Sequence, residues 1–243
     1  AYPSLIDFEK VRQICDEVGA IMWVDAAHFI GLVAGKAIPS PVPYADVVSF
    51  TTHKVLRGPR GGMILSKEKH AAAIDKAIFP GTQGGPIMSA VAGKAIVLKE
   101  CATAEYQSYA KKVIENCQEL AKSLENEGMR AVSGGTQTHL ALIDIRSTGV
   151  TGKVADERCG LSGITLNKNA IPYDPQTPAV TSGIRVGTAA TTTQGMGKNE
   201  MKQIASFIAR AIKEGENEGK AKAIRAEVHQ LTNQFPVYPE PKN

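Results

Sequence analysis

Long apolar runs, paired cysteines and a concentrated basic surface are all missing from this 243-residue sequence. No stretch approaches the roughly 20 apolar residues that a membrane-spanning helix needs. The four cysteines stand far apart without a C-x-x-C pair, which argues against a disulfide framework or a zinc site and is typical of reduced thiols in a cytosolic protein. The basic residues are scattered although the net charge is +4, which argues against nucleic acid as the main partner.

The composition is that of a globular protein, with 43% hydrophobic and 21% charged residues. The length suits one large domain or two ordinary ones. The chain opens on Ala1 rather than Met, in the middle of a helical pattern, so we expect the natural chain to continue upstream.

The first part of the chain alternates helical and strand-like segments. Residues 5–18 have helical spacing, with Ser4 and Asp7 as an expected capping box and Gly19 as the expected end. Three short apolar runs follow as expected strands, "AIMWVD" at 20–25, "ADVVSF" at 45–50 and "GMILS" at 62–66. This order predicts an α/β fold with a mainly parallel sheet.

The second part predicts a smaller α+β domain. A helix at 67–79 and a Gly-rich loop lead into one long helix over about 86–127, which we expect to bridge residues 1–100 and 101–243. Beyond it we expect strands and helices at 138–145, 153–161, 183–190 and 198–234.

Polar side chains cluster where two of the predicted strands end. Asp25 ends the first strand, and Thr51, Thr52, His53 and Lys54 end the second. Ligands of parallel sheets sit outside such carboxyl ends. A crowded lysine can act as an amine nucleophile, and a nearby aspartate can hold a ring nitrogen protonated, which is the pair that pyridoxal phosphate requires. Each residue also has a simpler interpretation when it is considered alone. Asp25 could be a turn residue, and Lys54 could be a solvated surface lysine.

Other segments offer cations and turns that suit an anionic ligand. "RGPRGG" supplies Arg57 and Arg60 among glycines, although surface turns often have this composition. "GTQGGP" precedes the long helix and is either an anion site or a simple tight turn. Arg185 lies in an apolar strand, where it binds either a substrate carboxylate or an internal acid.

Five segments together carry a resemblance to a known family. They are "VDAAHFIGLVAG", "SFTTHKVLRGPRGG", "PGTQGGP", "LNKNAIPYDPQTP" and "TSGIRVGT". In this order they closely resemble segments of serine hydroxymethyltransferase, and the resemblance covers essentially the whole chain. It implies the aspartate-aminotransferase-like fold, fold type I of the pyridoxal-phosphate enzymes. It also implies reversible hydroxymethyl transfer between serine and tetrahydrofolate, giving glycine and 5,10-methylenetetrahydrofolate, in a cytoplasmic homodimer or tetramer with shared active sites.

The resemblance also assigns roles to particular residues. Lys54 matches the lysine that binds the cofactor covalently, Asp25 the partner of its ring nitrogen, and Thr51 the threonine that takes part in exchanging lysine for substrate. His28 matches a histidine near the cofactor and substrate, and His53 one beside the phosphate. The remaining matches are Gly84 and Gly85 for the phosphate of a neighbouring subunit's cofactor, Arg185 for the substrate carboxylate, Asn169 for the folate pocket and Arg60 for a less defined cationic site.

The sequence departs from the family at three positions and in length. Val55 stands where threonine is usual, and Gln137 and Thr138 where an acidic residue and asparagine are usual. The family's chain is considerably longer on the N-terminal side. The resemblance therefore implies a C-terminal portion that is not a competent catalyst by itself.

Two other functions stay open from the residues. A threonine aldolase or another pyridoxal-phosphate lyase of the same fold would not need a pterin pocket at 166–175. A non-catalytic α/β interaction module would bind no cofactor and would not respond to glycine.

Overall fold

The structure is a computed structural model that describes residues 1–238, and it divides into two compact units. The N-terminal unit is Ile6–Lys111, and the C-terminal unit joins Ala1–Leu5 to Lys112–Asn243. We predicted a boundary near residue 100, whereas the division falls inside a helix at Lys111. Residues 239–243 of the expected second domain lie outside the described residues.

The first five residues belong to the C-terminal unit because hydrogen bonds hold them there. The backbone N–H of Gln137 donates to the Pro3 carbonyl at 2.8 Å, and the Leu5 N–H donates to the Gln137 side-chain oxygen at 2.9 Å. The Tyr2 hydroxyl lies 2.9 Å from that of Ser133. Gln137, one of the family departures, therefore anchors the start of the chain.

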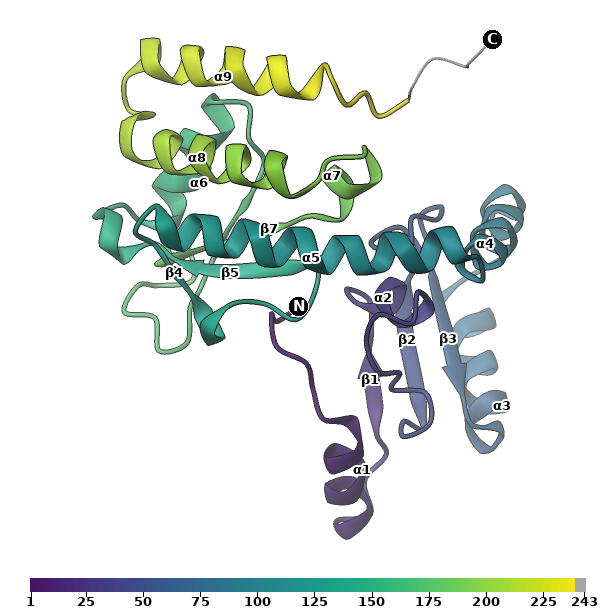
Figure 1. The fold of residues 1–243 in the computed structure, drawn as a ribbon. Helices are drawn as coiled ribbons and strands as arrows, with labels where there is room; N and C mark the ends of the chain where they lie inside the picture. Colours follow the sequence, from purple (N-terminus) through teal and green to yellow (C-terminus); the bar gives the residue numbers. More distant parts are fainter. Residues whose placement is uncertain (239–243) are drawn as a thin grey trace, which may run out of the picture. The chain divides into compact units, whose positions relative to one another are not determined.

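The N-terminal unit is a three-stranded sheet with helices around it (Figure 1). The strands are β1 (Trp23–Asp25), β2 (Val47–Thr51) and β3 (Gly62–Ser66), in the order β1-β2-β3. The helical elements are α1 (Phe8–Glu17), α2 (Ile30–Ala34), α3 (Glu68–Lys76), the π-helical turn η1 (Ala77–Thr82), α4 (Met88–Cys101) and the start of α5 (Ala104–Asn126).

The expectation of a mainly parallel sheet is wrong for this unit, whose sheet is mixed. β1 and β2 are parallel, but β2 and β3 are antiparallel. Residues 52–61 that join β2 to β3 are too few for a crossover connection, which needs a dozen or more. The strand β3 therefore returns alongside β2 in the opposite direction.

The C-terminal unit is an antiparallel sheet packed with helices, as expected for an α+β unit. Its strands are β4 (Arg130–Ala131), β5 (Leu140–Asp144), β6 (Asn167–Asn169) and β7 (Gly183–Gly187), in the order β4-β5-β7-β6. Its helices beyond α5 are α6 (Gly152–Leu161), α7 (Ala189–Thr193), α8 (Lys198–Glu214) and α9 (Glu218–Thr232), with 3₁₀ turns at Val132–Gly134 and Arg146–Thr148.

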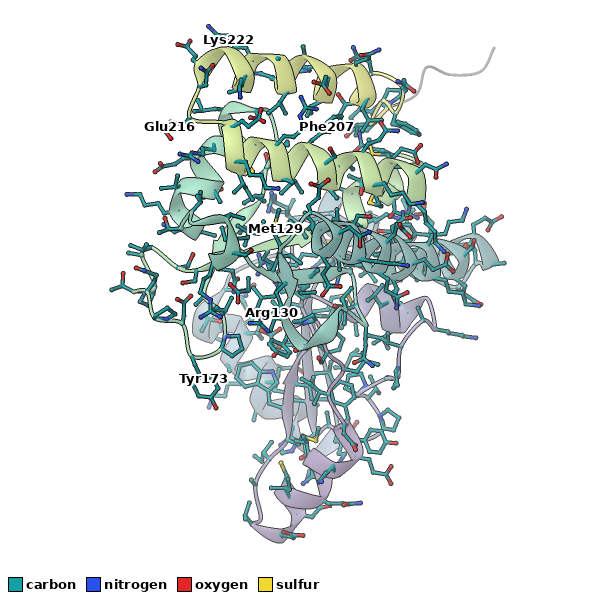
Figure 2. The ribbon with its side chains drawn as sticks, turned by 60° about the vertical axis from the view of Figure 1, so that its left-hand side comes forward. Met129, Arg130, Tyr173, Phe207, Glu216 and Lys222 are labelled. Carbon is teal, nitrogen blue, oxygen red and sulfur yellow. The ribbon has the colours of Figure 1, made fainter. Side chains whose placement is uncertain are left out.

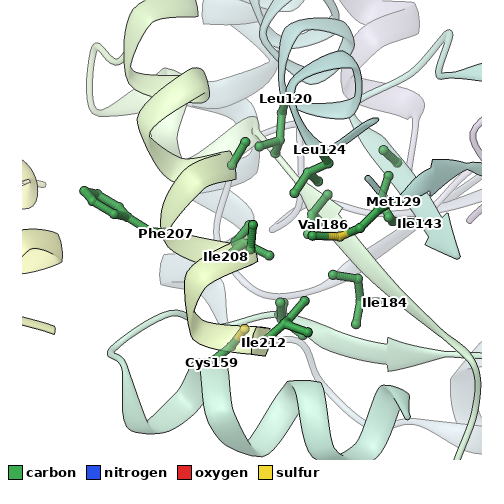
Figure 3. Packing of buried hydrophobic residues seen from close by; sticks show 14 of the residues in the cluster. Leu120, Leu124, Met129, Ile143, Cys159, Ile184, Val186, Phe207, Ile208 and Ile212 are labelled. Atoms are coloured by element: carbon green, nitrogen blue, oxygen red, sulfur yellow. The ribbon is translucent and has the colours of Figure 1, made fainter. Parts of the chain in front are cut away.

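One apolar core holds the C-terminal unit together. Figure 3 shows Leu120 and Leu124 of α5 beside Ile143 of β5, Ile184 of β7 and Ile208 of α8. All five of these side chains are at most 2% exposed. Burying each such side chain contributes about 1.5–3 kcal/mol. The helix spacing of α8 and the alternation in β5 both direct their apolar side chains into this cluster.

Two helix ends differ from the sequence expectation because other residues cap them. Asp7, not Ser4, caps α1 by accepting from the Lys10 N–H at 3.0 Å, so the helix begins at Phe8. The expected helix over 86–127 is two helices. The Thr103 hydroxyl accepts from the Tyr106 N–H at 3.2 Å and donates to the Glu100 carbonyl, which starts α5 as a new helix after α4.

All four cysteines have free thiols, and Cys101, Cys117 and Cys159 are buried. Burial raises the pKa of both Cys117 and Cys159 to about 12, so these thiols stay protonated and unreactive. Among residues 1–238, none of the helices is both long and apolar enough to cross a bilayer.

Candidate active site

The carboxyl ends of β1 and β2 lie side by side and are tied together. Asp25 pairs with Ser49 in the parallel register, and the Ala26 N–H donates to the Ser49 carbonyl at 2.8 Å. The hydroxyl of Thr51 donates to the Ala27 carbonyl at 3.2 Å. These bonds bring Asp25 and Thr51 to one edge of the sheet, as the sequence predicted.

The carboxylate of Asp25 is oriented by the backbone that follows it. Its Oδ1 accepts from the Ala27 N–H at 3.0 Å, and the side chain is exposed at the strand end. This bond fixes the position of one carboxylate oxygen.

Lys54 stands on a tight loop that closes on Thr52. The Thr52 side chain is fully buried, and its hydroxyl hydrogen is shared between the carbonyls of Pro59 at 2.6 Å and Gly61 at 3.2 Å. Its backbone accepts from the Gly58 N–H at 2.7 Å and donates to the Gly61 carbonyl at 3.0 Å. Lys54 therefore projects, half-buried, from a rigid turn rather than from a loose loop.

Two tyrosines of α5 brace the same loop from behind. The Tyr106 and Tyr109 hydroxyls donate to the Val55 carbonyl at 3.0 and 3.5 Å. Burial raises the pKa of the Tyr106 hydroxyl well above its ordinary value, so it remains a donor. Arg57 has a positive φ of 64°, and its guanidinium carbon lies 4.0 Å from the Tyr109 ring centre.

A pocket of about 1210 Å³ opens over these strand ends within the N-terminal unit. Five of the predicted site residues line it, Asp25, Thr51, Lys54, Arg60 and Gly85. Four cationic and two anionic side chains face it, which favours an anionic ligand. The volume exceeds the roughly 300–1,000 Å³ of common ligand pockets.

Three predicted site residues of the N-terminal unit do not line this pocket. Within the described residues, His28, His53 and Gly84 are not among those that line the pocket. His28 and His53 are half-buried, and His53 accepts from the Gly61 N–H at 3.4 Å through Nδ1. An added Cβ at Gly84 or Gly85 would meet no atom within 4 Å, so the backbone of this loop is open to a ligand.

Arg185 and Asn169 lie together on the sheet of the C-terminal unit. In the β6–β7 ladder Asn167 pairs with Arg185 and Asn169 with Gly183, so all these residues share one face. The Arg185 guanidinium donates to the Asn167 side-chain oxygen at 3.1 Å. This partner is a neutral amide, so the contact does not compensate the positive charge of the arginine.

Lys94 lines the pocket but was missed from the sequence. It projects from α4 and donates to the Gly62 carbonyl at 3.0 Å, next to Gly61, where an added Cβ would lie 2.8 Å from its side chain. The available signal was a single charged residue in the apolar run from Met88 to Leu98. A lysine in that position rarely serves packing alone.

The fold and the pocket define an α/β protein with a cation-lined site at the ends of two parallel strands. Residues 1–208 match the family model described as serine hydroxymethyltransferase. The serine hydroxymethyltransferase of Acidobacterium capsulatum is 51% identical over 238 residues, which cover 98% of this chain and 56% of that relative. The chain belongs to the serine hydroxymethyltransferase family, and it spans little more than half the length of this relative.

Proposed function

We propose that the chain acts, as part of the whole protein, in transfer of a hydroxymethyl group between serine and tetrahydrofolate with pyridoxal phosphate as cofactor. The products are glycine and 5,10-methylenetetrahydrofolate. The observation that carries the proposal is that Lys54 and Asp25 line one pocket, at adjoining ends of parallel strands. The family match supports the same chemistry.

The residues of the pocket fit pyridoxal phosphate. The half-buried Lys54 amine suits the covalent link, Asp25 suits the ring nitrogen, and the cationic excess suits the phosphate. When bound, the cofactor supplies an electron sink for charge at the substrate α-carbon. Asp25 would keep the ring nitrogen protonated, and His53 would serve the phosphate. The Gly84–Gly85 backbone would reach the phosphate of a neighbouring subunit's cofactor. Arg60 would belong to the substrate-binding residues.

The substrates would use the polar face of the C-terminal unit. Arg185 would bind the carboxylate of serine or glycine and so fix the bond that breaks, while Asn169 would contribute to the folate pocket. His28 and Thr51 would assist close to the cofactor. The finer fold assignment that goes with this proposal is fold type I, with the N-terminal unit as part of the cofactor-binding domain.

We also propose a homo-oligomer, a dimer or tetramer, in the cytoplasm. Three exposed apolar side chains support association: Ile87, the N-cap residue of α4, is 75% exposed, and Met88 and Ile96 within α4 are 66% and 62% exposed. Large exposed apolar side chains gathered along one helix are typical of an interface.

The test uses the protein with every residue that its gene encodes. Pyridoxal phosphate is added, the mixture is reduced with borohydride, and labelled peptides are mapped, while turnover of serine with tetrahydrofolate is measured in parallel. The proposal predicts a label on Lys54 and folate-dependent turnover, both lost in Lys54→Arg. Lys76→Arg is the matched control, because Lys76 lines the pocket but has no assigned role.

Two results would contradict the proposal. A label spread over many lysines would refute the role of Lys54. Turnover of threonine without tetrahydrofolate, together with no folate-dependent turnover of serine, would favour an aldolase instead.

A further inference from the structure

One carboxylate organises the loop between β6 and β7. Asp174 lies in residues 170–182, and both of its oxygens accept two hydrogen bonds. Oδ2 accepts from the backbone N–H groups of Ile171 at 3.1 Å and Ser182 at 2.9 Å. Oδ1 accepts from the Gln176 N–H at 2.8 Å and the Ser182 hydroxyl at 2.6 Å. The four bonds close the loop around a single side chain.

These bonds join the two strands that carry the predicted substrate residues. Ile171 is two residues after Asn169 on β6, and Ser182 is three residues before Arg185 on β7. The Oδ2 atom therefore connects the end of one strand to the start of the next. A slip of one residue in this ladder would move Asn169 or Arg185 to the opposite face. Asp174 thus fixes the register that places them on the same face.

The backbone around Asp174 is held in a conformation that it would not adopt freely. Tyr173 and Thr181 have φ values of 56° and 61°, in the left-handed region that favours glycine. Tyr173 is fully exposed at the tip of the loop, so no packing of its own holds it there (Figure 2). Strained residues persist where their surroundings over-determine them. Thr181 is held by its own backbone bonds to Thr177 and Gly152, both at 2.9 Å, and the Asp174 bonds hold residues on either side of Tyr173 and the one after Thr181.

Asp174 remains ionised at neutral pH. Burial alone would raise its pKa, but the hydrogen bonds from Ser182, Gln176 and Ile171 outweigh burial and lower the pKa to about 2. Charged acceptors form stronger hydrogen bonds than neutral ones. The loop is therefore held by a permanent charge in addition to the apolar packing of Ile171 against Val132 and Leu142.

We propose that Asp174 is a positioning residue that sets the affinity of the Asn169–Arg185 face for the substrate carboxylate and for folate without touching either. This inference rests on the proposed function. The inference predicts that substitutions of Asp174 change substrate affinity and not the chemical step. The reason is that Lys54 and Asp25 belong to the other unit, and their hydrogen bonds do not involve this loop.

The test is Asp174→Asn in the whole protein, since asparagine keeps the size but loses the charge and half of the acceptor capacity. We expect KM for serine and for tetrahydrofolate to rise about tenfold, the factor of one charge-assisted hydrogen bond. We expect kcat at saturation and borohydride labelling of Lys54 to stay unchanged. Ser182→Ala removes one of the four bonds and should raise both KM values by a smaller factor.

The matched control is Glu227→Gln, which removes a carboxylate bonded to Arg210 at 2.6 and 2.7 Å between α8 and α9. It should leave both KM values unchanged. Unchanged KM values in both Asp174→Asn and Ser182→Ala would overturn the inference. An equal rise of both KM values in Glu227→Gln would also overturn it, because the effect would then be one of general destabilisation. An unsubstituted protein without label and turnover would refute the proposed function itself, and this inference with it.

Discussion

Tyr106 donates its hydroxyl hydrogen to the carbonyl of Val55, the residue directly after Lys54. The tyrosine is 1% exposed and lies more than fifty positions away in the sequence, on a different element. A buried carbonyl without a donor is costly. The contact therefore couples the first turns of α5 to the conformation of the Lys54 loop.

The first prediction concerns that hydroxyl. Tyr106→Phe keeps the ring but leaves the Val55 carbonyl with only the longer bond from Tyr109. We expect a loss of about 1 kcal/mol in the free energy of unfolding, measured by urea denaturation. An unchanged denaturation midpoint would show that the Tyr109 bond is sufficient alone.

The second prediction concerns Gly31, which packs against the same loop. A Cβ on Gly31 would lie 2.6 Å from the Val55 carbonyl carbon and 2.7 Å from the Leu56 nitrogen, and backbone atoms cannot yield cheaply. We expect Gly31→Ala to destabilise by about 1–3 kcal/mol and to reduce borohydride labelling of Lys54.

Gly160→Ala is the control for Gly31→Ala, because a Cβ there meets no atom within 4 Å inside α6. It should stabilise by about 0.5–1 kcal/mol through helix propensity and leave the labelling unaffected. If both substitutions act alike, the close approach of Gly31 to the loop has no consequence.

Local patterns predicted most of the elements, but not the direction of every strand. The apolar runs at 45–50 and 62–66 are both strands, and the helical spacing of 153–161 and 198–234 is confirmed. The run over 20–25 is nearly all apolar, which is typical of a buried strand, yet Trp23 of β1 is 68% exposed. An apolar sequence shows that a strand can be buried. It does not show which other segments of the chain cover that strand.

The positions of site residues were predictable where each residue directly follows a predicted strand. Asp25, Thr51 and Lys54 meet because parallel strands end at one edge. Lys94, Tyr106 and Asp174 were not predicted, since each acts on a backbone carbonyl or N–H group. Such bonds depend on the tertiary structure, so no characteristic residue spacing in the sequence predicts them.

The third prediction concerns acid stability through Asp144 of β5. Burial would raise the pKa of Asp144, but hydrogen bonds from Arg146 and Arg130 lower it to about 2. A lowered pKa means that this carboxylate stabilises the fold above its ordinary value of 3.8 and loses that effect as the pH falls towards 2. Asp144→Asn should therefore cost about 1–3 kcal/mol at pH 7.

The difference between Asp144→Asn and the unsubstituted protein should shrink between pH 4 and pH 2, the window set by these two pKa values. Urea midpoints at several pH values measure it. Glu218→Gln is the control, since its pair with Lys222 is exposed on both sides and should contribute little at any pH. A constant difference at every pH would contradict the assigned ionisation.

The last prediction concerns charge at the Gly84–Gly85 loop. Gly85 lines the pocket, and no atom lies within 4 Å of the position of an added Cβ, so a small side chain fits without a clash. Gly85→Asp would place a carboxylate where the proposed function requires the phosphate of a neighbouring subunit's cofactor. We expect the dissociation constant for pyridoxal phosphate to rise on the order of tenfold, because like charges repel across a partly desolvated pocket.

Gly85→Asn has nearly the same shape without the charge and should bind the cofactor as Gly85→Ala does. Equal weakening by asparagine and aspartate would attribute the effect to shape, and unchanged binding in all three variants would remove this loop from the phosphate site.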